Sequence, residues 1–566
     1  MNSYKRKIEL IDLRISKLPK GTLIYKTINN IKQPYLQQTV NGKGKTTFIK
    51  KANREQVIKE IELREQLKKR RDELEREYAQ MSNLKKNLNS IIFKTNVLLD
   101  EDLEAFANSV SKYKYRFCFE DIQKYFKSEE VNKVLVLYGL RRTGKTTLIK
   151  QTILSLCEEE KEKTAYIQIS ANNTMAELKN DLELLYSSGF RNVFIDEITK
   201  MPDFIDGGAL LADIYVSRGM KILLSGTDSL GFYIAKKDSL YDRAILIHTT
   251  YISYHEFETV LGIKGIDTYI CYGGTMSIEG KHYNNDYMDK DNYNIDEYID
   301  SSISHNIQHS LKNYEFGTHF RNLEKFYNSG ELTNIINRVI EDINHRFTIQ
   351  VINSKFKSTD LGISQKNLRN DSDFDKNPLD YIDSNEFLNN LKSALEIIEE
   401  NEQKNKVDEN IVEAVKEYLF ALDIFKTVNI EYLPVNEINK LNVITQPGIR
   451  YSQGKLLLDS LLKDKNIQKL SSEQLIKLTN RILNEIRGRM MEEIVLLETK
   501  KAFPEKEVFK LRFAVGEFDM VIFDPEKVSC ELYEIKHSKE EVPQQYRHLA
   551  DEKKCRDAEF RYGTIL

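Results

Sequence analysis

The stretch that decides the fold is KVLVLYGLRRTGKTTLIK, which runs from Lys133 to Lys150. It begins with a short apolar run, continues through the spaced glycines Gly139 and Gly144, and ends in a segment with a helical pattern. Glycines let backbone N–H groups close around phosphate oxygens, and the start of a helix adds the positive end of its dipole. The spacing G-x-x-x-x-G-K-T between a strand and a helix therefore predicts a phosphate-binding loop, or P-loop.

This loop contains the groups that a nucleoside triphosphate with its metal requires. We predict that Lys145 reaches the β and γ phosphates and that the Thr146 hydroxyl binds Mg²⁺. The expected cofactors are ATP and Mg²⁺. The predicted nucleotide-binding residues are Gly139, Leu140, Arg141, Arg142, Thr143, Gly144, Lys145, Thr146 and Thr147.

Hydrolysis needs a second set of groups that hold the metal and activate a water. The run VFIDEI ends in Asp196, predicted to bind Mg²⁺, and Glu197, predicted to be the base that polarises the attacking water. A further run ends in LLSGTDS, where Ser225 or Thr227 is predicted to place a polar group near the γ phosphate. Arg243 has two interpretations, a transition-state arginine or a structural surface arginine.

Five apolar, β-branched runs alternate with helical stretches in this part of the chain. They are KVLVLYG, TAYIQIS, RNVFIDEI, MKILLSGT and RAILIHTT. Strands that are apolar at every position are buried on both faces, and helices between them predict a parallel sheet. The predicted fold class is therefore α/β multidomain, with a P-loop parallel-sheet core and a helical lid.

The last hundred residues contain a second group of acidic residues. EFDMVIFD places Asp519 on one expected strand, and ELYEIKHS places Glu534 and Lys536 two positions apart after it. Side chains at i and i+2 of a strand point to the same face, so these three are predicted to converge. Carboxylates bind Mg²⁺ and a lysine orients or deprotonates a water, as phosphodiester hydrolysis requires. Glu493, on the apolar face of the preceding helix, is predicted to be a further metal ligand.

The motifs together resemble a known family. G-x-R-R-x-G-K-T, F-I-D-E-I and S-G-T-D-S look like the AAA-type ATPases of bacteria and archaea that carry a C-terminal restriction-endonuclease-like domain. The resemblance covers roughly residues 110–262 and 440–566. It implies that Asp196 and Glu197 are the Walker B pair and that Thr227 is the polar residue at the strand end. The charged middle of the chain departs from that family's compact lid, which leaves the arginine finger open.

The C-terminal pattern resembles the PD-(D/E)XK nuclease fold. The match consists of Glu493 on a helix, then Asp519, then Glu534-Ile535-Lys536. The resemblance implies a helix after the sheet, in which Gln545 and His548 support the catalytic groups. Because nuclease folds also serve as binding platforms, cleavage and partner binding both stay open for this domain.

The N-terminal segment is basic. Residues 1–90 contain 22 Lys and Arg against 10 Asp and Glu, whereas the whole chain has a net charge of −3. Three short alternating runs between residues 22 and 50 predict a β-meander. The seven-residue spacing of Leu67, Leu74 and Met81 predicts a helical hairpin or short coiled coil. Such an arm either contacts nucleic acid phosphates or is a soluble structural element.

Composition excludes several classes of protein. The chain is 40% hydrophobic and 30% charged, which is typical of globular domains. Its five cysteines are scattered singly, without metal-ligand or redox-pair spacing. No apolar run approaches the roughly 18 residues of a membrane span, so we expect no membrane contact and a cytoplasmic location.

These observations predict five units. They are a basic β-meander at 1–50, a helical hairpin or coiled coil at 51–100, an ATPase core at 101–262, a lid with a winged-helix-like region at 263–440, and a nuclease-like domain at 441–566. Within the fourth, FKSTDLGISQKNLRN predicts a helix-turn-helix element.

The predicted function is an ATPase whose nucleotide state controls a nuclease-like domain that acts on or binds DNA, in defence or mobile-element biology. The alternative is an ATP-dependent signalling or scaffold protein in which an inactive nuclease fold binds a partner. A homo-oligomer is compatible with either function, because AAA-type sites are often completed across a subunit boundary.

Overall fold

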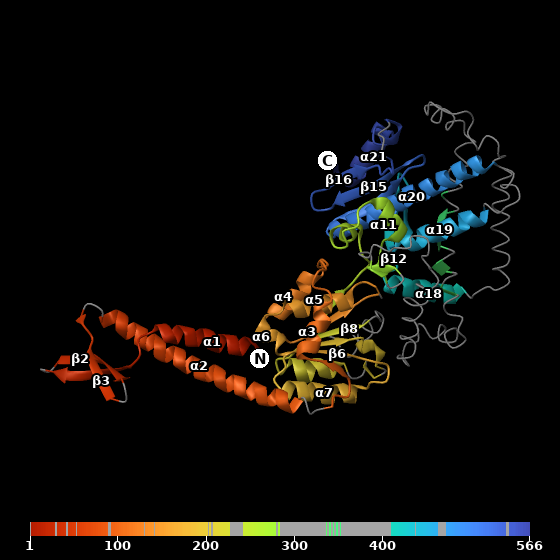
Figure 1. The fold of residues 1–566 in the computed structure, drawn as a ribbon. Coiled ribbons are helices and arrows are strands. Elements are labelled where there is room, and N and C mark those ends of the chain that lie inside the picture. Colours follow the sequence, from red (N-terminus) through yellow and green to blue (C-terminus); the bar gives the residue numbers. More distant parts are fainter. Residues whose placement is uncertain are drawn as a thin grey trace.

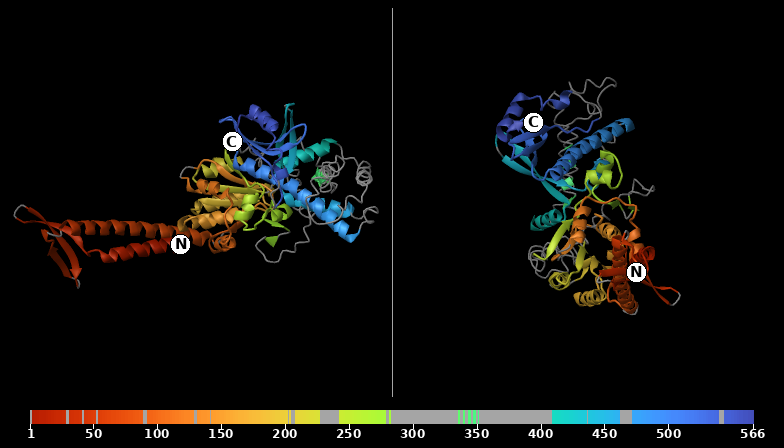
Figure 2. Two further views of the ribbon diagram at one scale, coloured as in Figure 1. Left: turned by 90° about the horizontal axis from the view of Figure 1, so that it is seen from above. Right: turned by 90° about the vertical axis from the view of Figure 1, so that its left-hand side faces the viewer.

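The computed structural model shows a body from which a long N-terminal arm projects (Figures 1 and 2). The body contains two β-sheets with their helices. The structure describes residues 2–28, 31–40, 43–51, 54–88, 92–128, 131–140, 142–201, 203–204, 208–226, 242–278, 281–282, 409–435, 437–461, 471–538 and 543–566, with isolated positions between 335 and 351.

The arm consists of two helices with a small sheet at its tip. The helices are α1 (Asn2–Lys17) and α2 (Arg54–Leu88), and the antiparallel strands are β1 (Thr22–Ile28), β2 (Ile31–Val40) and β3 (Lys43–Phe48). The predicted β-meander is therefore present. Helix α1 packs along α2. The helical pair is therefore formed by residues from the start of the chain and from the second segment, whereas the prediction placed it within 51–100.

A sequence signal for α1 was present and was missed. Tyr4, Ile8, Ile11 and Ile15 recur at spacings of four and three residues, and all four are shielded from solvent while most of their neighbours are exposed. This is the seam of a two-helix coiled coil. The helix is short and highly charged, which hid its periodicity next to the clearer strand pattern that follows.

The central sheet contains all five predicted strands. Its order is β4-β6-β7-β8-β5-β9, with β4 antiparallel to β6 and the other pairs parallel. The strands are β4 (Asn96–Leu98), β5 (Val134–Tyr138), β6 (Thr164–Gln168), β7 (Asn192–Asp196), β8 (Lys221–Gly226) and β9 (Ala244–His248). Strands β5, β7 and β8 run in parallel, so their C-terminal ends meet at one edge of the sheet. Ligands bind at this edge in open α/β sheets.

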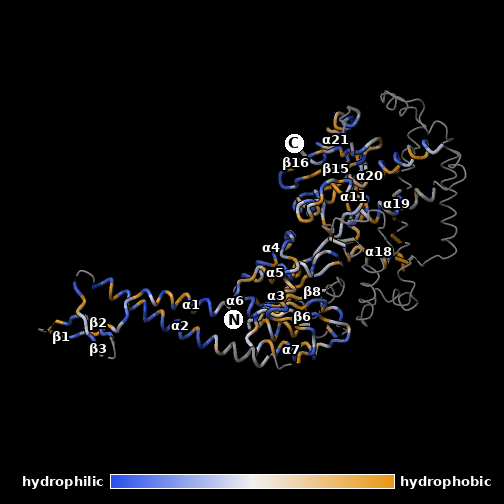
Figure 3. Tube along the Cα trace, in the orientation of Figure 1, coloured by the Kyte–Doolittle hydropathy of each residue, from blue (hydrophilic) through white to orange (hydrophobic). Residues whose placement is uncertain are grey.

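Helices cover both faces of this sheet. Leu135 and Leu137 of β5 pack with α3 (Asp100–Asn108), α4 (Phe119–Lys127) and α5 (Lys145–Ser155). Val134 and Val136 pack on the opposite face with α7 (Met175–Ser187) and η3 (Leu211–Val216). The apolar core strands stand out against the hydrophilic α2 in Figure 3. Two short elements, α6 (Glu158–Lys161) and η2 (Ile198–Lys200), complete this unit.

The C-terminal sheet has the order β13-β12-β14-β15-β16-β17. Its strands are β12 (Phe425–Tyr432), β13 (Glu437–Ile444), β14 (Glu507–Arg512), β15 (Glu517–Asp524), β16 (Ser529–Tyr533) and β17 (Thr564–Ile565). Because β12 pairs in parallel with β14, this sheet begins near residue 425, before the predicted boundary at 441. The long helix α20 (Ser472–Ala502) packs against β12, β14 and β15.

The helix predicted after this sheet begins later than expected. Pro543–Tyr546 forms the single 3₁₀ turn η7, and α21 spans Glu552–Tyr562. Asp551 fixes the start of α21, since its carboxylate accepts hydrogen bonds from the backbone N–H groups of Lys553 and Lys554 at 3.1 and 3.3 Å. Gln545 and His548 therefore precede the helix.

Short helices connect the two sheets. They are α10 (Tyr254–Thr259), α11 (Ile266–Tyr272), α18 (Glu409–Ala421) and α19 (Pro447–Leu461), accompanied by the hairpin β10 (Ser277–Ile278) and β11 (Lys281–His282). Leu140 of the P-loop packs into an apolar cluster with Val415 and Leu419 of α18. The predicted helix-turn-helix at 356–370 lies outside the described residues. No helix in the described ranges is long and apolar enough to cross a membrane.

A buried carboxylate secures the connection between the arm and the central sheet. Asp181 of α7 is fully buried and accepts hydrogen bonds from the backbone N–H groups of Lys94 and Thr95 and from the Thr95 hydroxyl, at 2.7 to 3.0 Å. These residues lead into the edge strand β4. Asp181 thus holds the chain segment that joins α2 to the sheet.

We expect Asp181→Ala to lower the free energy of unfolding of this unit by about 3 kcal/mol, because it leaves buried donors without an acceptor. Denaturant titration monitors the effect. The matched control is Glu183→Ala on the same helix, which removes an exposed pair with Arg218 and is expected to cost less than about 1 kcal/mol. Equal losses in the two variants would contradict the anchoring role.

Candidate functional site

The P-loop adopts a conformation that only glycine allows at two positions. Gly139 has φ +147° and Gly144 has φ +88°. A Cβ on Gly139 would lie 2.4 Å from the carbonyl oxygen of Thr249, so the end of β9 presses against the start of the loop. Gly144 immediately precedes α5, whose first residue is Lys145. The loop therefore leads into the N-terminus of a helix, as predicted.

Lys145 and Thr143 are both buried within the loop. The Lys145 ammonium donates hydrogen bonds to the carbonyl oxygens of Gly139 and Leu140 at 2.8 and 2.7 Å. Thr143 Oγ1 donates to the carbonyl of Leu140 at 2.8 Å and lies 2.9 Å from Thr249 Oγ1. These contacts hold the cation inside the curve of the loop, which is the position for a phosphate-binding lysine.

Asp196 is the centre of the polar network at the strand ends. It is 3% exposed, and it accepts hydrogen bonds from Thr146 Oγ1 at 2.9 Å, Ser225 Oγ at 2.6 Å and Tyr166 OH at 3.1 Å. The carboxylate of β7 therefore meets the hydroxyl at the start of α5. A carboxylate and a hydroxyl at this distance are ligands that Mg²⁺ accepts in P-loop sites, so the residues fit the implied metal.

Tyr166 is a site residue that sequence reasoning missed. It lies on β6, beside β7, and its hydroxyl reaches Asp196 Oδ2. Burial, and next the Asp196 carboxylate, raise the pKa of Tyr166 far above its ordinary value. The signal in the sequence was one polar-tipped aromatic within the apolar run TAYIQIS, which looks like an ordinary core residue without the fold.

Glu197 lies directly after Asp196 in a left-handed backbone conformation, with φ +60°. This conformation is uncommon for a residue other than glycine and marks a constrained turn. Its backbone N–H donates to Asp196 Oδ1 at 3.0 Å, and its carboxylate lies 3.7 Å from the Lys200 ammonium. The two acidic side chains therefore have different partners: Asp196 accepts hydrogen bonds from three hydroxyls, and Glu197 lies beside Lys200.

The remaining predicted nucleotide-site residues have mixed outcomes. Arg142 has φ +66°, and its carbonyl accepts a hydrogen bond from Met276 N at 2.8 Å. Thr147 lies in the first turn of α5. Arg243 Nε donates to Asp213 at 2.7 Å on the surface, which matches its structural interpretation. Arg141 and Thr227 lie outside the described residues.

In the C-terminal unit, Asp519, Glu534 and Lys536 come together. The Lys536 ammonium donates to Asp519 Oδ2 and to Glu534 Oε2, each at 2.8 Å, and the backbone N–H of Ile535 donates to Asp519 at 2.8 Å. Burial raises the pKa of Glu534 to about 7, aided by the Asp519 carboxylate and opposed by Lys536. The predicted juxtaposition is therefore present, but Glu534 and Lys536 lie just beyond the end of β16 and not on a strand as the spacing argument assumed.

Glu493 does not join this group. Its carboxylate is ion-paired with the buried guanidinium of Arg450 on α19, so the predicted metal ligand is a structural residue of the interface between α19 and α20. The neighbouring Glu492 faces the cleft instead. Ligand atoms of Glu492, Glu517 and Asp519 lie within 4.8 Å of one another. The prediction placed the acid one residue away because helical periodicity alone does not say which of two adjacent faces meets the sheet.

A cleft of about 810 Å³ surrounds these groups. Its acidic residues are partly balanced by cations: Lys510 Nζ donates to Glu492 at 2.7 Å, and Arg512 Nε donates to Glu517 at 2.7 Å. Burial would raise the pKa of Glu517, but Lys510, Arg512 and Arg489 together lower the pKa of Glu517 to about 2. Gln545 and His548, the predicted supporting residues, also line the cleft, together with three arginines. These residues are Arg489, Arg512, Gln545, Arg547 and His548.

Comparison with known proteins adds to this geometry. Residues 131–258 match the family described as AAA domain, so this part of the chain is an AAA-type P-loop ATPase domain. Among solved structures, the Hsp104–ADP complex of S. cerevisiae is similar at 10% identity, with a TM-score of 0.24. The similarity covers 69% of this chain and 50% of the Hsp104 chain, so the chain spans about half of that length, and this low similarity says nothing about function. No curated protein matches the sequence.

Two substitutions test the nucleotide site. Lys145→Ala is expected to abolish ATP binding, because the loop loses its buried cation. Glu197→Gln is expected to keep ATP binding and to lower turnover by about 10²- to 10⁴-fold, as loss of a general base does. A fluorescent ATP analogue measures binding and phosphate release measures turnover. The control is Lys161→Ala, which removes a partly exposed cation of α6 paired with Glu158. Normal hydrolysis by Glu197→Gln would exclude it as the base.

Proposed function

We propose that this chain is an AAA-type ATPase whose nucleotide state controls a Mg²⁺-dependent, nuclease-like cleft that acts on DNA. ATP and Mg²⁺ bind at the P-loop, with Lys145 at the phosphates, Thr146 and Asp196 at the metal, and Glu197 at the attacking water. The observation that carries the control is the position of helix α20, which borders the cleft and also contacts α10 of the ATPase domain.

Helix α20 touches the cleft in its middle and the ATPase domain near its end. Glu492 faces the cleft, whereas the Glu498 carboxylate accepts hydrogen bonds from the backbone N–H groups of Tyr254 and His255 at 2.9 and 3.3 Å. These N–H groups belong to the first turn of α10. Glu498 therefore caps a helix of the ATPase domain, and burial raises the pKa of Glu498 despite these hydrogen bonds.

A buried ion pair extends this connection to the P-loop. Arg116 donates to both carboxylate oxygens of Glu256 on α10, at 3.0 and 2.7 Å, and to the P-loop carbonyl of Thr143 at 2.7 Å. Lys501 of α20 lies 3.8 Å from the same Glu256 carboxylate. Rearrangement of the P-loop around a nucleotide therefore acts on α10, and through it on α20.

The cleft residues fit the metal that phosphodiester hydrolysis uses. In addition to the three clustered carboxylates, Glu534 Oε1 is buried and has no hydrogen-bond partner in the described part of the chain. When bound, Mg²⁺ supplies Lewis-acid polarisation of a phosphoryl oxygen. Lys536, held by both Asp519 and Glu534, is placed to orient a water. Arg547 lines the same cleft and suits a phosphodiester anion.

One observation favours a second candidate, a signalling or scaffold protein with an inactive nuclease fold. Glu492 and Glu517 already bind Lys510, Arg489 and Arg512, so these two acids are satisfied without a metal. In that case the cleft binds a partner, and the ATPase controls binding instead of cleavage.

Plasmid nicking distinguishes the two candidates. With Mg²⁺ present, wild type is expected to nick supercoiled DNA, and Lys536→Ala and Glu492→Gln are expected to lose at least about 10²-fold in rate. Agarose gels measure the reaction, and Lys527→Ala, on an exposed turn, is the control. Equal nicking by wild type and Lys536→Ala would remove the catalytic assignment.

The adjacent Glu493→Gln has a different expected effect. It leaves the buried Arg450 without its counter-charge and is expected to lower stability by about 3 to 5 kcal/mol. Thermal unfolding of the two neighbouring variants therefore separates the structural acid from the cleft acid. A greater loss of stability in Glu492→Gln than in Glu493→Gln would contradict this division.

Coupling is tested at Arg116. Arg116→Lys cannot keep the bidentate contact with Glu256 and the bond to Thr143 together. We expect this variant to bind ATP but to lose the nucleotide dependence of DNA cleavage and of amide hydrogen exchange in α20. The control is Lys114→Ala, two residues away, which removes an exposed bond to the carbonyl of Thr259. Unchanged nucleotide dependence in Arg116→Lys would contradict the connection, and the exchange readout does not require an active nuclease.

A further inference from the structure

The tip of the arm is a positively charged sheet without acidic residues. Residues 20–54 contain eight basic residues and no Asp or Glu. The basic residues are Lys20, Lys26, Lys32, Lys43, Lys45, Lys50, Lys51 and Arg54. The shaft helix α2 differs, because there acidic and basic side chains alternate and pair, as Lys68 does with Glu65 and Arg70 with Glu73. The uncompensated charge is therefore concentrated at the tip, because the rest of residues 1–90 carries 14 Lys and Arg against 10 Asp and Glu.

Strand register places Lys26 beside an aromatic row on one face of this sheet, whereas Lys32 and Lys45 occupy register positions on the other face. Ile24 is opposite Tyr35, and Tyr35 is opposite Phe48, so the three form a row across β1, β2 and β3. The rings of Tyr35 and Phe48 are 5.3 Å apart, and the Lys26 ammonium lies 5.2 Å from the centre of the Tyr35 ring. Phe48 is 41% exposed, so its ring is accessible to a ligand.

The same face carries polar side chains that can read a polar ligand. By register, Gln33 is opposite Lys26, and Gln37 is opposite both Thr22 and Thr46. Amides and hydroxyls interleaved with aromatic rings and lysines are typical of surfaces that bind nucleic acid. The exposed Ile28 and Ile31 lie opposite each other at the hairpin end of the same face, so a membrane surface is the competing ligand that the test must separate from nucleic acid.

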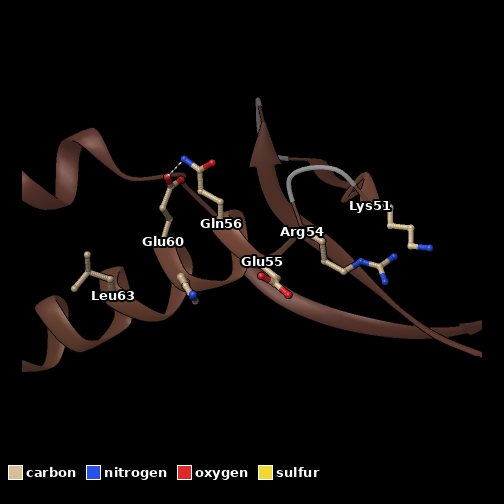
Figure 4. Close-up of a pocket in the computed structure, with 7 residues that line it drawn as sticks. Lys51, Arg54, Glu55, Gln56, Glu60 and Leu63 are labelled. Atoms are coloured by element: carbon tan, nitrogen blue, oxygen red, sulfur yellow. Dashed lines mark hydrogen bonds between the residues drawn. The ribbon is translucent and has the colours of Figure 1, made fainter.

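A second basic feature lies where the sheet joins α2. A cavity of about 870 Å³ is lined by the cations Lys51, Arg54 and Lys59 and by the acids Glu55 and Glu60, with Gln56 and Leu63. Figure 4 shows Lys51 and Arg54 extending to the same side, away from the pair formed by Gln56 and Glu60. Arg54 Nε is buried and has no hydrogen-bond partner in the described part of the chain. Arg54 Nε is therefore one donor at this cavity that suits a phosphate oxygen.

The shaft holds this surface away from the body. Helix α2 has 35 residues, which corresponds to a length of about 50 Å at 1.5 Å per residue. The tip sheet lies at its far end, on the opposite side from the central sheet (Figures 1 and 2). A ligand at the tip therefore does not compete for space with the nucleotide site or with the C-terminal cleft.

We propose that the arm tip is a binding site for single-stranded nucleic acid. Its lysines and Arg54 bind backbone phosphates, and Phe48 with Tyr35 provides a stacking surface for unpaired bases. The site recognises the polymer and not a sequence, because cations and ring faces are available to any base. It is independent of whether the C-terminal cleft cleaves DNA.

The test measures binding in a background that cannot cleave. Full-length Lys536→Ala protein is titrated into a labelled single-stranded DNA of about 20 nucleotides, and fluorescence anisotropy gives Kd at several salt concentrations. The tip variant is K26Q/K32Q/K45Q, all at exposed positions. We expect at least about a tenfold rise in Kd and a salt dependence shallower by about 2, since each lost phosphate contact contributes about 0.7.

The matched control removes the same charge from the shaft. K68Q/K69Q/R70Q takes three cations from α2 and is expected to change Kd less than about twofold. Equal weakening by the two triple variants, or no weakening by either, would overturn the proposal, since the tip would then have no special role. Far-UV circular dichroism verifies that both variants fold.

Two further arms of the experiment test the choice of ligand. Phe48→Ala is expected to weaken single-strand binding about tenfold and duplex binding less, as loss of base stacking requires. An equal effect on duplex and single strand would overturn the assignment to unpaired bases. Binding of the tip to phosphatidylserine vesicles, lost in the triple variant while DNA binding persists, would overturn it in favour of a membrane surface.

Discussion

The contact between Arg116 and Glu256 is the interaction on which the rest of the structure depends. Both side chains are almost fully buried, and the guanidinium also donates to the P-loop carbonyl of Thr143. Burial alone would raise the pKa of Glu256, but the two bonds from Arg116 hold the pKa of Glu256 below its ordinary value. Breaking a buried pair of this kind costs about 3 to 5 kcal/mol. The pair therefore joins the P-loop to α10, which α20 contacts through Glu498 and Lys501.

Two neighbouring acids on α20 show how environment assigns different tasks to the same chemical group. Glu493 is buried against Arg450 between two helices, where its charge is compensated locally. Glu492 faces β14 and β15. There Lys510 and Arg489 each form ion pairs with both Glu492 and Glu517. A lone buried carboxylate is costly, so each acid has a cation, but only one of them borders a cleft.

The arm combines a shaft of mixed charge with a tip that has basic residues and no acidic ones. Along α2, opposite charges at spacings of three or four residues cancel, as expected of a solvated coiled-coil surface. At the tip, the absence of acids leaves the lysines facing solvent and repelling one another, which stabilises neither the sheet nor the shaft. A ligand that carries dense negative charge removes this repulsion, and the exposed Phe48 adds a surface for flat rings.

The sequence by itself determined the features that depend on local spacing. The P-loop, its five strands, and Asp196 with Glu197 follow from strand patterns and helix geometry over a few residues. The convergence of Asp519, Glu534 and Lys536 was also predicted, although Glu534 and Lys536 lie just beyond the end of β16. Only the tertiary structure decided that α1 pairs with α2, that β12 joins the C-terminal sheet, that Tyr166 reaches Asp196, and that Glu492 replaces Glu493 in the cleft. Each of these depends on which faces of distant segments meet, and a local pattern does not specify the partner of a face.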